Sequence, residues 1–333
     1  MKKLLFLFIF LFPAAVFFQT SAADDGLGDN VDAVVTSDQN SRREVAVTFD
    51  DLPATYGDAD LERLRSITSR LLDTIKRNKV PAIGFVNERK LHRNNQMKER
   101  AALLKMWLDA GLDLGNHTFS HIAIDQVPIS AYQEDVIKGE PITRALLEER
   151  GMKLKYFRHP QLRTGPTPDY KKGLEQFLAS RGYTAAPVTI DNNDFMFAAV
   201  YGDAKMRGDT ATMKRVADAY VPYMESVFEF FEKLSVDFLG YEVKQTLLLH
   251  ANDLNADHFE DLVRMMKKRG YSFITLDEAL KDKAYQLPDT VNKRGISWLH
   301  RWMIAKGLPM RPEPSEPKLI SELFQARQRS MSW

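Results

Sequence analysis

Cysteine is absent from this chain of 333 residues, and neither sign of charge predominates. Without cysteine the chain can form no disulfide framework, no thiolate metal site and no lipid-bearing cysteine. Its 46 Lys and Arg residues nearly balance its 45 Asp and Glu residues, so it lacks the basic field that general nucleic-acid-binding proteins direct at phosphates. Beyond residue 23, no stretch is long and apolar enough to cross a bilayer. We therefore expect a mature chain that folds on its hydrophobic core, with no nucleic-acid partner and no transmembrane span.

The first residues do contain an apolar run, and its flanks are those of a secretory signal peptide. Two lysines precede apolar residues 4–18, and small residues follow at 21–23. The pattern predicts a signal peptide over 1–23 and export to the periplasm or the medium. The alternative is an uncleaved membrane anchor, which Pro13 and the short apolar run disfavour.

Three further regions differ in composition. Residues 24–43 are polar and rich in Gly, Asp, Asn and Ser, so they are expected to be a flexible leader. Residues 44–285 alternate short apolar runs with longer segments of helical spacing, which predicts α/β architecture with a mainly parallel sheet, either a (β/α) barrel or a doubly wound sheet. Residues 286–333 are basic and proline-rich and are expected to form a helix followed by a tail. The alternative for this tail is a basic arm that touches an anionic polymer or a membrane surface.

The first candidate site residues follow the strand expected at 45–49. Asp50 and Asp51 are adjacent carboxylates, which repel each other unless a cation lies between them or one of them is protonated. In parallel α/β folds the active site gathers at the carboxyl ends of the strands, where these two residues lie. The alternative is that both residues are acids that cap a helix after the strand, which would give the same sequence.

Two histidines four residues apart form the second candidate. His117 and His121 follow an apolar strand, and on one helical turn both imidazoles can reach a single metal ion. With Asp51 they would give two imidazoles and one carboxylate, a set that suits zinc or a similar divalent ion but also serves non-haem iron oxygenases. Two ordinary surface or core histidines are the alternative.

Later strands also end in polar residues. Arg158 precedes a proline that fixes the turn, and its guanidinium can clamp a carboxylate. His250 ends a strongly apolar strand, where an acid partner would make it a proton donor near neutral pH. Asp191 and Asp194 are the acids of a further segment. The alternative for Arg158 is an ordinary surface arginine, and for His250 it is a buried structural histidine. The two acids would then be ordinary loop residues.

Taken in order, these segments resemble the motifs of the polysaccharide deacetylase family, the NodB-homology carbohydrate esterases. The family patterns are TFDD, H-[ST]-x-x-H, R-x-P-[YF], D-x-x-D-W and L-x-H. Here they read TFDD, HTFSH, RHPQ, DNNDF and LLH within residues 48–250. The resemblance covers most of residues 44–285. It implies a distorted (β/α) barrel with fewer than eight regular strands, followed by a helical C-terminal extension.

The resemblance also implies roles for individual residues. Asp50 would be the general base, held by Arg158, and His250 would be the general acid, oriented by Asp194. Asp51, His117 and His121 would hold a divalent metal, zinc in the first place or else cobalt, nickel or manganese.

The substrate side of the site departs from the family pattern. The backbone N–H of Gln161 would complete the oxyanion hole, and Leu248 would line the pocket for the acetyl methyl group. Gln161 replaces an aromatic residue of the family, and Phe195 replaces a tryptophan, which bears on substrate class more than on catalysis. Residues 195–209 are expected to form a sugar-facing lip that includes Tyr201.

The activity implied is hydrolysis of acetyl groups on a glycan such as peptidoglycan or a chitin-type oligosaccharide, with N-acetyl groups as the main expectation. An esterase for O-acetyl groups is a close variant. A non-catalytic glycan-binding relative of the same fold is a second alternative. An iron-dependent oxygenase is the third, although it has no evident use for Arg158 and His250.

Overall fold

The computed structural model describes residues 43–57, 59–292 and 294–331. The expected signal peptide (1–23) and all of the expected leader (24–43) except Arg43 lie outside the described residues. The described residues all belong to one compact unit of the chain.

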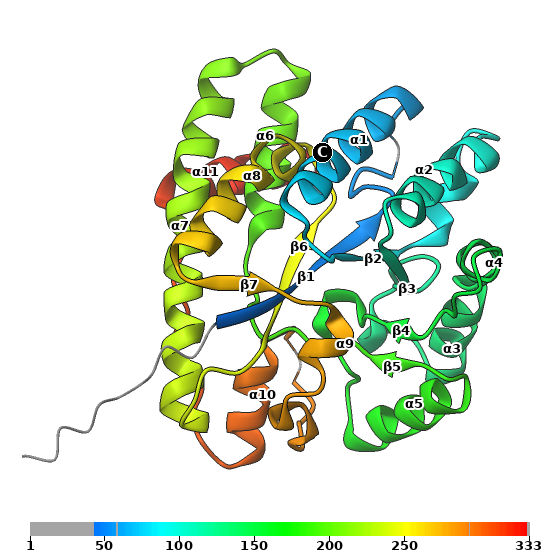
Figure 1. The fold of residues 1–333 in the computed structure, drawn as a ribbon, viewed down its shortest axis with the longest axis vertical. Helices are drawn as coiled ribbons and strands as arrows, with labels where there is room; N and C mark the ends of the chain where they lie inside the picture. Colours follow the sequence, from blue (N-terminus) through cyan, green and yellow to red (C-terminus); the bar gives the residue numbers. More distant parts are fainter. Residues whose placement is uncertain (1–42, 58, 293, 332–333) are drawn as a thin grey trace, which may run out of the picture. The chain divides into compact units, whose positions relative to one another are not determined.

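A parallel sheet of seven strands forms the centre of the fold (Figure 1). Its strands are β1 (Arg43–Leu52), β2 (Ile83–Val86), β3 (Asp113–Asn116), β4 (Tyr156–Phe157), β5 (Thr184–Ala185), β6 (Gln245–His250) and β7 (Tyr271–Phe273). The strand order is β5-β4-β3-β2-β1-β6, and β7 pairs with the first residues of β1. Every one of these pairs is parallel, as the alternation of strands and helices in the sequence predicted.

Residues 188–190 join the two ends of this strand order. The backbone N–H groups of Thr189 and Ile190 both donate to Thr246 O at 3.0 Å, and Leu248 N donates to Ile190 O at 3.2 Å. Ile190 also pairs in parallel with Leu247. The chain that follows β5 therefore pairs with β6 and closes the barrel. The fold is a distorted (β/α) barrel, and this confirms the predicted fold class.

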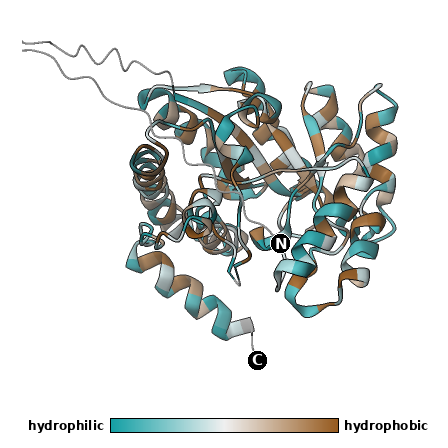
Figure 2. Cartoon of the chain, turned by 90° about the horizontal axis from the view of Figure 1, so that it is seen from below, coloured by the Kyte–Doolittle hydropathy of each residue, from teal (hydrophilic) through white to brown (hydrophobic). Residues whose placement is uncertain are grey.

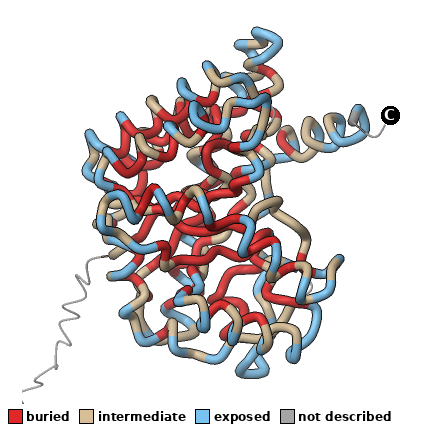
Figure 3. Tube along the Cα trace, turned by 90° about the vertical axis from the view of Figure 1, so that its right-hand side faces the viewer, coloured by how far each residue is buried: buried red, intermediate tan, exposed pale blue. Residues whose placement is uncertain are grey.

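Helices surround the strands, which are buried along most of their length (Figures 1 and 3). Those before β6 are α1 (Leu61–Asn78), α2 (Met97–Asp109), α3 (Ile129–Lys138), α4 (Pro141–Glu148), α5 (Pro168–Ser180), α6 (Asp194–Met206) and α7 (Thr210–Leu239). Those after β6 are α8 (Asp253–Lys268), α9 (Leu276–Ala279), α10 (Trp298–Ala305) and α11 (Lys318–Met331), and short 3-10 turns include η1 (Glu88–His92), η3 (Pro160–Leu162) and η4 (Lys283–Gln286). Local chemistry sets their ends: Asp60 caps α1 by accepting from Arg63 N at 2.8 Å, and left-handed Lys79 ends it.

Two segments differ from the conformation that the sequence predicts. The apolar spacing of residues 130–150 predicts one helix, but the chain forms two, which are separated at Gly139 and Glu140 because Pro141 starts a new helix more readily than it continues one. The lip expected at 195–209 is instead helix α6. Its Tyr201 is 4% exposed and donates from its hydroxyl to Asp257 Oδ2 at 2.9 Å, so this residue is part of the core and does not face a sugar.

The C-terminal extension packs on the barrel. Helix α10 buries Leu299 and Trp302 in the main hydrophobic core. Where the sequence predicted a tail, the chain forms a second helix, α11, along which hydrophobic and hydrophilic residues alternate (Figure 2). Its Ile320 is fully buried. None of the helices within residues 43–57, 59–292 and 294–331 combines the length and the hydropathy that crossing a bilayer requires.

Candidate active site

A cavity of ≈ 440 Å³ lies where the strands of the barrel end. Among the residues that line it are Asp50, Asp51, His117, His121, Gln161, Phe195, Leu248 and His250. Arg158 and Asp194, which the sequence also singled out, lie behind this lining and contact Asp50 and His250. Chain segments up to two hundred residues apart therefore meet at one place.

The backbone of β1 aims two successive carboxylates into this cavity. In a regular strand, successive side chains point to opposite faces of the sheet. Here Asp51 has a φ of 73°, in the left-handed region that Asp tolerates better than most residues. The pairing of β1 with β2 also shifts register between Phe49 and Leu52. This local turn brings Asp50 and Asp51 to the same side of the barrel.

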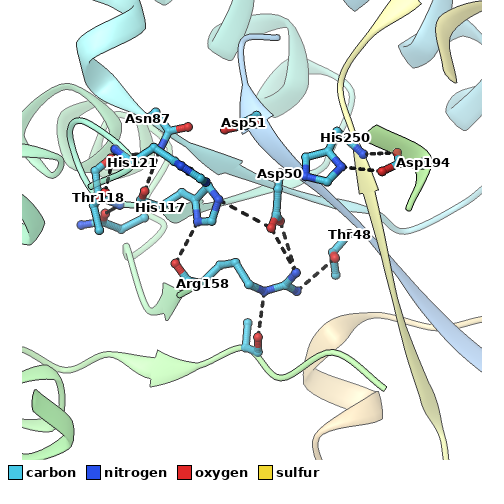
Figure 4. A network of polar contacts seen from close by, with 12 residues as sticks. Thr48, Asp50, Asp51, Asn87, His117, Thr118, His121, Arg158, Asp194 and His250 are labelled. Carbon is cyan, nitrogen blue, oxygen red and sulfur yellow. Dashed lines mark hydrogen bonds and ion pairs between the residues drawn. The ribbon is translucent and has the colours of Figure 1, made fainter. Parts of the chain in front are cut away.

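Asp50 is held by a buried arginine (Figure 4). Arg158 Nη1 lies 3.3 Å from both carboxylate oxygens of Asp50, and its Nη2 donates to Thr48 Oγ1 at 3.0 Å. Its Nε donates to Ala186 O at 2.8 Å, so the guanidinium is anchored on two sides. Burial raises the pKa of Asp50 to about 6, although the charge of Arg158 opposes the rise. Asp50 is thus an oriented carboxylate that can take up a proton near neutral pH.

Asp51, His117 and His121 form a group that could hold a metal ion, because one donor atom from each lies within 4.8 Å of the others. His117 Nδ1 lies 2.8 Å from Arg158 O, and since a carbonyl only accepts, Nδ1 carries the hydrogen. That assignment leaves a lone pair on Nε2, which lies 3.6 Å from Asp50 Oδ2 and can bind a cation. Burial lowers the pKa of both histidines, so both are neutral at pH 7, the form that binds metals. The donor set fits a divalent cation.

The loop that carries the two histidines is fixed by its own hydrogen bonds. Asn87 Nδ2 donates to His117 O at 2.6 Å, and Thr118 N donates to Asn116 Oδ1 at 2.7 Å. His121 N donates to Thr118 Oγ1 at 3.1 Å. Thr118 and His121 both have positive φ, so the loop is not the regular helical turn that the spacing suggested.

Lys90 of η1 is a site residue that sequence reasoning missed. Its Nζ lies 2.9 Å from Asp51 Oδ1 and donates to Asp51 O at 3.0 Å. Burial disfavours a charged Asp51, but Lys90 holds the pKa of this carboxyl well below its usual range. The string ERKLH has the charge of an ordinary surface segment, and nothing in it signals this contact.

His250 and Asp194 form a hydrogen-bonded pair on the other side of Asp50. His250 Nδ1 lies 2.6 Å from Asp194 Oδ1, and His250 N donates to Asp194 Oδ2 at 2.9 Å. Asn255 Nδ2 donates to the same oxygen at 2.9 Å. Burial alone would lower the pKa of His250, but the charge and hydrogen bond of Asp194 raise it to about 9. In register, Asp50 and His250 are direct partners on neighbouring strands.

The remaining predicted residues shape the cavity wall. Gln161 has a φ of 55° and lines the cavity, as does Leu248, which is 6% exposed. Phe195 is 42% exposed, and its ring contacts Phe324 of α11 edge-on with centroids 5.8 Å apart. Asp191 also lines the cavity, and burial raises its pKa to about 7.

Comparison with known proteins agrees with the family resemblance. Residues 37–186 match the family profile described as polysaccharide deacetylase. This match covers 150 of the 333 residues, and it makes the polysaccharide deacetylases the family to which this chain is similar. A peptidoglycan-N-acetylglucosamine deacetylase of Bacillus cereus is 32% identical over 120 residues, which are 36% of this chain. The match spans 37% of the length of that relative.

Solved structures give weaker likenesses. A mutant of a carbohydrate esterase family 4 pseudoenzyme from Bacillus anthracis matches with a TM-score of 0.49 and 16% identity, over 72% of this chain and 68% of that chain. A polysaccharide deacetylase from Bacillus cereus matches with a TM-score of 0.47 and 18% identity, over 79% of this chain and all of that chain. Likenesses this weak say nothing about the function of this chain, which depends on its own side chains.

Proposed function

We propose that this protein is a metal-dependent hydrolase that removes N-acetyl groups from a cell-wall or chitin-type glycan. The observation that carries the proposal is the convergence of three groups in one cavity. These are the possible metal ligands Asp51, His117 and His121, the oriented carboxylate Asp50 and the His250–Asp194 pair. Hydrolysis of an amide needs an activated water, a stabilised oxyanion and a proton for the leaving amine, and this set supplies a candidate for each.

Asp51, His117 and His121 would hold the divalent ion, with zinc as the proposed occupant and cobalt, nickel or manganese as substitutes. A zinc ion bound there would lower the pKa of water to about 7 and polarise the acetyl carbonyl. A hydrolase is favoured over an iron-dependent oxygenase because Asp50 and His250 form an acid–base pair. Hydrolysis requires such a pair, whereas an oxygenase has no use for it.

The other residues of the site would move and hold protons. Asp50, oriented by Arg158, would accept the proton of the attacking water. The backbone N–H of Gln161 would donate to the developing oxyanion, and Leu248 would pack on the acetyl methyl group. His250, kept charged by Asp194, would give its proton to the departing amine.

Acetate release tests this proposal. Purified protein would be incubated with N-acetylated chitooligosaccharides, with peptidoglycan and with an O-acetylated polysaccharide, before and after chelation and with each metal restored singly. We expect chelator-sensitive acetate release from an N-acetylated glycan that zinc restores. Release from the O-acetylated polymer alone would instead identify an esterase. Binding of glycans without release from any of them would identify a non-catalytic relative.

The proposal also includes export, since wall glycans lie outside the cytoplasm. Cleavage of the signal peptide would leave residues 24–43 as a leader, residues 44–285 as the catalytic domain and residues 286–333 as its extension. N-terminal sequencing of the protein recovered from the cell envelope or the medium tests the cleavage site, and a mature chain that begins at Asp24 is the expected result.

A further inference from the structure

The turn that carries Gln161 has an uncommon backbone. Gln161 and Leu162 are consecutive residues with φ values of 55° and 53°, both in the left-handed region. Residues with a Cβ rarely adopt this conformation, least of all twice in succession, so the turn needs support from its surroundings. Its internal hydrogen bonds are Leu162 N to His159 O at 3.0 Å and Arg163 N to Pro160 O at 3.2 Å.

Arg301 of α10 supplies part of the support. Its side chain is fully buried, and its Nη2 donates to Leu162 O within the turn. Its Nη1 donates to Thr164 Oγ1 at 3.2 Å and to Thr290 O at 2.9 Å. Burial lowers the pKa of Arg301 to about 10, so the guanidinium remains charged at neutral pH. One cation thus connects the turn to the C-terminal extension.

Gly295 packs closely against the same turn on the side that faces the cavity. It lines the cavity, and a Cβ added to it would lie 1.9 Å from Gln161 O and 2.9 Å from Gln161 C. No side chain fits at that separation without a shift of the Gln161 backbone. The chain that follows Gly295 is anchored to residues 188–190, which close the barrel. Ser297 Oγ donates to Thr189 O at 2.6 Å, and Trp298 N donates to Val188 O at 2.7 Å.

We infer that Arg301 and Gly295 are positioning residues that hold the Gln161–Leu162 turn at the cavity, so that the C-terminal extension is part of the catalytic unit. The inference rests on the proposed function, in which the N–H of Gln161 is an oxyanion donor. Both residues lie beyond residues 37–186, the part of the chain that matches the family. They act through backbone atoms of the turn rather than by contact with substrate.

The variants Gly295→Ala, Arg301→Met and Arg301→Lys test the inference in the metal-loaded protein. Displacement of an oxyanion donor acts on the transition state more than on the bound substrate. We therefore expect kcat on an N-acetylated chitooligosaccharide to fall about 10- to 100-fold, with KM and the dissociation constant for zinc within about twofold of wild type. Arg301→Lys should recover part of the loss, because it retains the charge but not the planar fork.

Hydrogen exchange gives a readout that does not depend on activity. Peptides covering residues 159–165 should take up deuterium faster in Gly295→Ala and Arg301→Met than in wild type. Gly307→Ala is the control: Gly307 also lies in the extension, and a Cβ there meets nothing within 4 Å, although its φ of 75° is positive, unlike that of Gly295. This control should lose some thermal stability while keeping both kcat and the exchange of the turn.

Each outcome decides the question. If Gly295→Ala folds and keeps the kcat and exchange of wild type, or if Gly307→Ala matches its losses, the inference is wrong. Gly295→Ala leaves the guanidinium in place, so it decides the matter even if Arg301→Met does not fold. If wild type releases acetate from no glycan, the proposed function fails, and exchange at residues 159–165 alone then decides whether the extension holds the turn.

Discussion

Lys90 Nζ lies 2.9 Å from Asp51 Oδ1, so a cation of the protein already faces the carboxylate that would bind a metal ion. Both side chains are largely buried, at 16% and 14% exposure, which keeps their attraction from being screened away. Lys90 therefore stabilises the charge of Asp51 in the metal-free protein, and it would repel a divalent ion that arrives there.

Replacing Lys90 with methionine should separate these two effects. Loss of the ammonium removes the repulsion, so zinc should bind Lys90→Met roughly tenfold more tightly. The metal-free variant should melt at a lower temperature than metal-free wild type, because Asp51 is left buried without its partner. Calorimetric titration and melting curves with and without zinc measure both quantities. Lys90→Arg, which keeps the charge, is the control, and equal zinc affinity in Lys90→Met and wild type would contradict the repulsion.

Changes at Asp50 and at His117 should have different consequences. Asp50→Asn removes the proposed base but none of the three proposed metal ligands, so zinc should still bind while kcat falls by a factor of about 10² to 10⁴. His117→Ala removes a ligand and should weaken zinc binding by more than the roughly 10- to 100-fold typical of residues that merely support a ligand. Metal content and acetate release, measured on the same preparations, test the contrast. Near-full turnover by Asp50→Asn would show that Asp50 is not the base.

The dependence of kcat/KM on pH should be bell-shaped. The rate should rise as Asp50, whose pKa is raised to about 6, loses its proton, and fall as His250, whose pKa is raised to about 9, loses its own. A divalent cation nearby favours charged Asp50 and neutral His250, so in the metal-loaded enzyme both limbs should lie at or below these values. A rate that keeps rising above pH 9 would be incompatible with His250 as the proton donor.

Asp194→Asn should move the alkaline limb to lower pH, because it removes the charge that raises the pKa of His250. The change should also reduce stability in a pH-dependent way. The pKa of His250 is higher in the folded state than its ordinary value near 6.5, so the pair stabilises the fold fully below that pH and loses its contribution as pH rises through about 9. The melting-temperature gap between wild type and Asp194→Asn should therefore narrow between pH 6.5 and 9. A constant gap would mean that Asp194 acts only through neutral hydrogen bonds.

The order of the strand-end motifs predicted much of the fold and many of the cavity residues. Parallel strands bring their carboxyl ends to one edge, so Asp50, His117 and His250 could be expected to meet before any coordinates were known. The contacts of Lys90 and Arg301 could not be predicted. Each joins residues that are distant in sequence. Lys90 lies in a segment whose charges look like those of a solvated surface, and Arg301 is a charged residue within an otherwise mainly apolar helix. The break at Pro141 was missed because the apolar spacing continues across it, and α6 was missed because it lacks a clear apolar stripe.

The left-handed backbone at position 51 places the proposed base, Asp50, and a proposed metal ligand, Asp51, on adjacent residues of one strand. Because the carboxylates at 50 and 51 are neighbours on the same strand, their separation is set by covalent geometry and a single backbone rotation. Thermal motion that shifts loops or helices would therefore move the two carboxylates together. A substitution at position 51 that restores the ordinary extended strand would therefore do more than delete a proposed metal ligand, because it would also change the direction of the neighbouring carboxylate, the proposed proton acceptor.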